Sequence, residues 1–177
     1  MPTLPTNPKD ERLFLKGIKN HAAFRKQLAD LSISSDFALF DQKVVDVVNC
    51  WYTLAKEHLT EARTALASRS ARSVYSRSYY AAYNASKAIR YIVYGEVSLR
   101  GDDHTKAASE LPDDFPGVDK WASIIATLYE HRLRADYDNW TDTSGEHTFS
   151  PRDCIDHAEH FVNDCALYAK SKFGQSL

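Results

Sequence analysis

Residues 74–95 read VYSRSYYAAYNASKAIRYIVYG, and this stretch decides the fold class. It contains no proline and only a terminal glycine, the two residues that interrupt helices most strongly. Apolar or small residues recur in it at steps of three or four, which predicts the buried face of one helix: Val74, Ser78, Ala82, Ala85, Ile89 and Val93. Because the middle of this face is small, a neighbouring helix can approach closely. Gly95 is expected to end the helix.

Glycine and proline organise the rest of the chain in the same way. Neither residue occurs in 36–94, 118–144 or 152–173, and a break near Ser70 divides the first of these stretches. Each stretch carries apolar residues at helical spacing. The expected buried faces are Phe40, Val44, Val47, Val48, Trp51, Ala55, Leu59, Ala62 and Leu66, then Val118, Trp121, Ile125, Leu128 and Ala135, and finally Cys154, Ala158, Phe161, Cys165 and Tyr168.

These stretches predict an all-α fold, a four- to five-helix up-and-down bundle. Ser150 followed by Pro151 is a typical start for the last helix. No stretch shows the sustained alternation of a strand. An amphipathic segment over 10–31 is expected to precede the bundle. The predicted division is therefore an amino-terminal tail and accessory helix over 1–39 and a helical bundle over 40–177.

Composition places the chain among globular proteins of the cytoplasm. It has 177 residues, 44% hydrophobic and 26% charged, with no apolar run long enough to span a membrane. The first residues resemble no secretory signal, and the three cysteines lack the spacing of a zinc site. We therefore expect a cytoplasmic location, no membrane association, and no metal or cofactor.

Charge is unevenly distributed although the net charge is only −2. Six basic residues and one acid lie between Arg69 and Arg100, and six acids and one lysine follow between Asp102 and Asp119. Such a chain can hold an anion on one face. The basic segment can equally bind the acidic segment of the same chain.

Arg132 interrupts the predicted buried face of the third helix. The steps that connect Ile125 and Leu128 lead next to Arg132, and a charge in a core position must have a partner. Asp136 lies four residues further on, within reach of an ion pair on the same helix. Two interpretations remain open: a structural arginine–aspartate pair, or a guanidinium that the core holds toward a phosphate.

One side of the predicted helix between the break near Ser70 and Gly95 combines basic and aromatic residues: Arg72, Ser76, Tyr80, Tyr83, Lys87, Arg90 and Tyr94. Basic residues between tyrosines suit single-stranded RNA, because phosphates meet charge and bases stack on rings. Tyrosine and arginine are also enriched at protein interfaces, so a subunit interface is the alternative.

Histidines offer little evidence for an enzyme. His157 and His160 are three residues apart, with no third metal ligand near them in sequence. His104, in an expected loop, is the histidine most free to swing toward Arg132. The cysteines fall on apolar faces, as inert core residues do. The commoner enzyme signatures are absent from the sequence.

Two segments resemble the HEPN-domain family. Residues 76–88, SRSYYAAYNASKA, resemble its second core helix, and HTK at 104–106 is similar to the loop that follows. LYEHRLRADYD at 128–138 resembles the Arg-x-x-Ala-Asp-Tyr stretch of one branch of the family. The resemblance covers about residues 44–173 and leaves out the region up to about Leu39.

The resemblance implies a small helical bundle, usually a homodimer, from prokaryotic toxin–antitoxin, defence or RNA-processing systems. Active members are metal-independent endoribonucleases whose motif is an arginine followed, after four to six residues, by a histidine. The histidine moves a proton and the arginine stabilises the developing charge. Arg132 matches the motif arginine. Tyr137 stands five residues later, and no histidine follows until His147.

The sequence thus favours an RNA- or nucleotide-binding component of a defence or toxin–antitoxin module with a degenerate ribonuclease motif. Arg132, Asp136, Arg72, Tyr80, Lys87 and Arg90 are the predicted binding residues. A cleaving version would use Arg132, His104 and Tyr137. The third alternative is a non-catalytic scaffold that binds a partner protein. A homodimer is expected in the first two cases.

Overall fold

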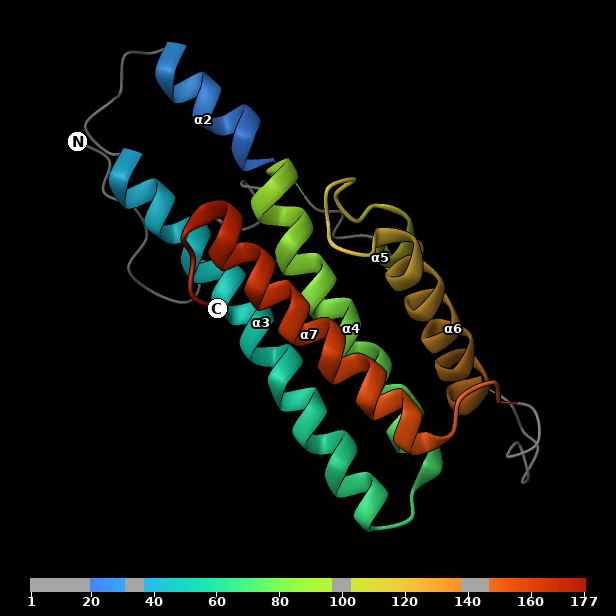
Figure 1. The fold of residues 1–177 in the computed structure, drawn as a ribbon. Coiled ribbons are helices and arrows are strands. Elements are labelled where there is room, and N and C mark those ends of the chain that lie inside the picture. Colours follow the sequence, from blue (N-terminus) through green and yellow to red (C-terminus); the bar gives the residue numbers. More distant parts are fainter. Residues whose placement is uncertain (1–19, 31–36, 97–102, 138–146) are drawn as a thin grey trace.

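The computed structural model describes residues 20–30, 37–96, 103–137 and 147–177 (Figure 1). These residues form six helices: α2 (His21–Asp30), α3 (Phe37–Ala67), α4 (Ala71–Tyr94), α5 (Asp103–Ser109), α6 (Val118–Tyr137) and α7 (Pro151–Phe173). Within these ranges the only β-type pairing is one isolated bridge between Asn20 and Glu96. None of the helices there has the length and apolar character that crossing a membrane requires.

The four long helices α3, α4, α6 and α7 run alternately up and down, which confirms the predicted bundle (Figure 1). Helix α4 lies at the centre and packs against α3, α5, α6 and α7. Ala81, Ala82, Ala85 and Ala88 are fully buried, so α4 is covered on more than one side. The small side chains predicted from the sequence permit this close packing because backbones can approach one another.

Helix ends follow the local signals in the sequence. Gly95 ends α4 with a φ of +74°, a left-handed conformation that glycine adopts without strain. Ser150 caps α7: its hydroxyl accepts a hydrogen bond from the Asp153 N–H at 3.2 Å, and the Asp153 carboxylate accepts one from the Ser150 N–H at 3.0 Å. This is a capping box, with Pro151 in the first turn.

The predicted core faces are largely confirmed, with several corrections. Every predicted core residue of α7 is buried, and so are six of the nine predicted for α3. The predicted core residues that are only half-buried are Val47, Trp51, Leu66, Val93 and Val118. The prediction missed Tyr52, which is buried because its hydroxyl reaches across to the Val162 carbonyl at 3.1 Å. Cys50 is exposed, so its assignment to the core was wrong.

Two short helices complete the bundle. Helix α5 occupies 103–109, where the sequence predicted a loop; at seven residues it is too short to show a clear apolar period. Helix α2 confirms part of the amphipathic segment over 10–31, of which 10–19 and 31 lie outside the described residues. Its His21 N–H donates to the Gly95 carbonyl at 2.6 Å. The division between residues 39 and 40 stays a prediction.

Candidate functional site

Arg132 lies near the end of α6 at the edge of the core. Its side chain is 11% exposed, whereas the neighbouring His131 is only 1% exposed. The expectation that Arg132 continues the core face of α6 was wrong by one residue. The next core residue after Leu128 is His131, three residues later, and not Arg132, four residues later.

Five polar or aromatic contacts with three residues hold the Arg132 guanidinium in place. Its Nε lies 2.7 Å from Asp136 Oδ2, an ion pair whose angle is too poor for a hydrogen bond. Its Nη2 donates to the Tyr80 hydroxyl at 2.9 Å and approaches the Tyr137 hydroxyl at 3.5 Å. The same two rings lie 5.4 and 5.2 Å from Cζ, as in cation–π pairs.

The third guanidinium nitrogen of Arg132, Nη1, is open to solvent. No acceptor within the described residues binds Nη1, and Nη1 is not one of the buried polar atoms without a partner. Solvent therefore reaches it. Burial lowers the pKa of Arg132, but Tyr80 and Asp136 outweigh burial and raise it above its ordinary value, so the guanidinium stays charged. The site thus offers a permanent cation with a free donor.

His104 belongs to the same cluster. Its Nδ1 lies 2.9 Å from the Tyr79 hydroxyl, and the rings of Tyr83 and Tyr129 lie 4.6 and 5.9 Å from its own. Burial lowers the pKa of His104, and the Arg132 charge lowers it further. The imidazole is therefore neutral near pH 7. The expected freely swinging loop was wrong, because His104 sits in α5 and these rings fix it.

A buried ion pair attaches α5 to α4 and so positions His104. Arg90 and Asp103 are 2% and 1% exposed, with Nη1 and Oδ1 3.0 Å apart. The Tyr83 hydroxyl donates to the other carboxylate oxygen at 2.8 Å. Burial raises the pKa of Asp103, but the hydrogen bond and charge of Arg90 outweigh it, so the pKa is lowered overall. Arg90 was predicted on the binding surface; this is wrong, because the guanidinium is enclosed.

The other predicted binding residues are placed differently. Arg72 Nη1 donates to the Ala135 carbonyl at 3.0 Å, near the end of α6. The Lys87 side chain is 12% exposed, and its ammonium lies 3.6 Å from Asp103 and 5.1 Å from the Trp51 ring. Tyr137 is 68% exposed. The structure therefore brings Arg132, Asp136, Tyr80, Tyr137 and His104 into one cluster, whereas Arg90 and Lys87 bind the buried carboxylate beside it.

Sequence reasoning missed His58 on α3, which contacts this cluster. The centroid of its ring lies 5.6 Å from that of Tyr80, and its Nδ1 lies 3.2 Å from Glu61 Oε2. The signal in the sequence is weak: a histidine and a glutamate three residues apart on one helix are common. Only packing of α3 against α4 brings His58 to Tyr80.

Metal and thiol chemistry find no support among the described residues. In that part of the chain no three His, Cys, Asp or Glu side chains converge as metal ligands would. His157 packs its ring against Phe149 at 4.5 Å. Burial raises the pKa of Cys154 to about 12 and also raises that of Cys165, so both thiols stay protonated.

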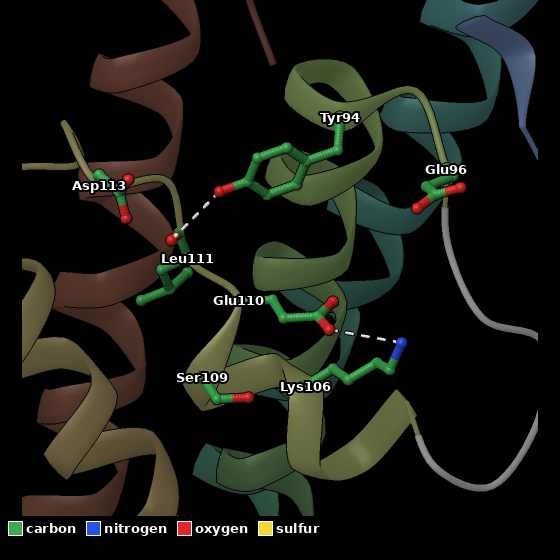
Figure 2. A pocket seen from close by; sticks show the side chains of 7 residues that line it. All are labelled: Tyr94, Glu96, Lys106, Ser109, Glu110, Leu111 and Asp113. Carbon is green, nitrogen blue, oxygen red and sulfur yellow. Dashed lines mark hydrogen bonds and ion pairs between the residues drawn. The ribbon is translucent and has the colours of Figure 1, made fainter. Parts of the chain in front are cut away.

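A pocket of about 450 Å³ lies elsewhere, where the end of α4 meets α5 (Figure 2). Glu96, Glu110 and Asp113 line it together with Lys106, which is paired with Glu110 at 3.3 Å. Tyr94 extends over it and donates to the Leu111 carbonyl at 3.4 Å. The excess of carboxylates makes this pocket a poor site for an anion, so the candidate site is the cluster around Arg132.

The protein is thus an α-helical bundle in which the guanidinium of Arg132 lies between two tyrosines and reaches solvent. The sequence model of the HEPN domain matches residues 48–168, more than half of the chain, and the protein belongs to the HEPN-domain family. The matched range begins within α3 and ends within α7, so it contains the whole cluster. Searches of curated proteins and of solved structures gave no significant match.

Proposed function

We propose that this HEPN-domain protein binds RNA or a nucleotide at Arg132, as a component of a prokaryotic defence or toxin–antitoxin module. The observation that carries the proposal is the open Nη1 of a guanidinium that Asp136, Tyr80 and Tyr137 hold in place. A fixed guanidinium with a free donor suits a phosphate oxygen. The exposed ring of Tyr137 offers a stacking surface for a base beside it.

The cluster supports binding better than cleavage. A general acid must carry a proton that it can release near the working pH, and the lowered pKa keeps His104 neutral there. Tyr137 stands at the position where the family's motif expects a histidine, and a phenol is a poor base at neutral pH. The alternative of a metal-independent endoribonuclease rests on the presence of Arg132 and His104 in one cluster.

Family membership supports the remaining parts of the proposal, a homodimer and a partner protein from the same module. Light scattering after gel filtration would measure the mass of the assembly. A mass of twice 20.1 kDa is expected. A monomer over the concentration range of the binding assay would remove the homodimer from the proposal.

Fluorescence anisotropy with labelled single-stranded RNA tests the binding proposal. We expect affinity to fall steeply with salt, because phosphate contacts release counterions. Arg132→Gln should weaken binding about 10- to 100-fold, the effect of one charge-assisted contact. Arg152→Gln is the matched control, because it removes the same charge from an exposed position on α7 and should change little. Equal losses in both variants, or no binding by the wild type, would favour a scaffold instead.

A cleavage assay in EDTA separates binding from turnover. The wild-type protein and the Arg132→Gln and His104→Ala variants would be incubated with labelled RNA. We expect no product from any of them. A product that the wild type forms and both variants lose would establish the endoribonuclease alternative. A product that persists in Arg132→Gln would exclude Arg132 as a catalytic residue.

A further inference from the structure

The pocket at the end of α4 has carboxylates on two opposite sides of an aromatic ring. Figure 2 shows Asp113 on one side of the Tyr94 side chain and Glu96 on the other. Tyr94 is 44% exposed, and its hydroxyl donates to the Leu111 carbonyl at 3.4 Å, so the ring is held as a wall of the pocket. The volume of about 450 Å³ is enough for a small organic molecule.

The third carboxylate of the pocket, that of Glu110, is compensated within the protein. Lys106 Nζ lies 3.3 Å from one of its oxygens. Arg90 Nη1, which is enclosed, lies 3.6 Å from the other. Glu110 and Lys106 therefore neutralise each other, and Glu110 attracts a further cation only weakly.

The carboxylates of Glu96 and Asp113 lack such compensation. Asn20 Nδ2 donates to Glu96 Oε2 at 2.7 Å, but an amide carries no charge. Within the described part of the chain, no basic side chain lies at ion-pair distance from either carboxylate. Burial raises the pKa of Tyr94, and the charges of Asp113 and Glu110 raise it further, as expected where the potential is negative. The pocket thus presents two separated negative charges.

A single metal ion does not suit this arrangement. Mg²⁺ and Ca²⁺ need several oxygen ligands around one point, at about 2.0–2.6 Å. Glu96 and Asp113 instead lie on opposite sides of a tyrosine side chain (Figure 2). A ligand that neutralises both carboxylates must therefore carry two positive charges that are separated from each other.

We propose that this pocket binds a linear diamine, with one ammonium group at Asp113, the other at Glu96, and the carbon chain along the Tyr94 ring. Primary ammonium groups are charged at neutral pH, as that of lysine is. Each brings hydrogen-bond donors to a carboxylate, while the aromatic face attracts the cation and packs against methylene groups. The small polyamines belong to this chemical class. The inference does not depend on the proposed binding at Arg132, because other residues form the pocket.

Isothermal titration calorimetry of the full chain with putrescine and cadaverine tests the site. Butylamine is the control ligand, because it has a similar carbon chain but one ammonium group. We expect the better diamine to bind about tenfold more tightly than butylamine, the effect of one charge-assisted contact. Asp113→Asn and Glu96→Gln should each remove this advantage. Asp156→Asn removes the same charge from an exposed position on α7 and should keep it.

Each other outcome overturns the proposed site. Equal affinity for the diamines and butylamine would exclude a ligand that spans both carboxylates. Losses in Asp113→Asn and Glu96→Gln no larger than that in Asp156→Asn would show that amines gather at negative surface charge in general. A loss in only one of the two variants would reduce the site to a single carboxylate. Displacement of the bound diamine by an equal concentration of Mg²⁺ would assign the pocket to a metal ion. Absence of binding at millimolar diamine would exclude the site altogether.

Discussion

Replacing Asp103 with alanine should destabilise the protein strongly, because it leaves the Arg90 guanidinium buried without its carboxylate. Both side chains are almost fully enclosed, and they lie 3.0 Å apart. Removing one partner of such a pair costs about 3–5 kcal/mol. The Tyr83 hydroxyl loses its acceptor as well, which adds about 1 kcal/mol. Glu110, 3.6 Å from Arg90 but 46% exposed, replaces little of the lost charge.

Urea denaturation followed by circular dichroism measures this loss. A domain of this size is stable by about 5–15 kcal/mol, so Asp103→Ala should unfold at a much lower urea concentration. Glu159→Ala breaks the exposed pair with Arg63 and should cost less than about 1 kcal/mol. The double variant Arg90→Met with Asp103→Leu should recover part of the loss, since it removes both fully buried charges and leaves only the 12% exposed Lys87 without its carboxylate. A loss in Asp103→Ala no larger than that in Glu159→Ala would refute the buried pair.

Three further predictions concern stability. Ser150→Ala removes the side-chain cap of α7 and should cost about 1 kcal/mol in urea denaturation; an unchanged midpoint would contradict the capping box. Gly95→Ala should cost more than about 1 kcal/mol, because φ is +74° and a Cβ would lie 2.6 Å from the Ala22 Cβ; a stabilised variant would contradict this packing. Burial lowers the pKa of His131 to about 4, so stability should be complete above pH 6.5 and fall by at most about 3 kcal/mol as the pH drops to 4. His131→Gln should show a smaller fall over this range, and an identical fall would contradict the buried neutral histidine.

Features that depend only on residues close together in the sequence could be predicted. Ser150 and Pro151 at the start of α7, and Gly95 at the end of α4, act through their own backbone and side-chain chemistry. All five core residues predicted for α7 are buried, because only one side of that helix is buried and its apolar period is clear. The prediction missed Ile155, Val162 and Ala169 on the same side. The family followed from short segments whose residue order is distinctive, and the HEPN match confirms it.

Features that depend on packing between helices could not be predicted. Helix α4 is buried on more than one side, so its period could not separate the enclosed Arg90 from the half-exposed Tyr80. The partner of Arg90 is on α5, a helix too short for the sequence to reveal. At the end of α6, steps of three and four residues are equally regular, which is why Arg132 was predicted in place of His131.

NMR of arginine side chains would show whether the Arg132 guanidinium contacts the ligand. The Nε–Hε resonance of Arg132 would be followed while a short single-stranded RNA is added, with the resonance of the enclosed Arg90 as internal reference. We expect the Arg132 resonance to shift in a saturable manner, whereas that of Arg90 stays in place. Saturable binding of the RNA with no shift at Arg132 would show that the ligand does not contact this guanidinium.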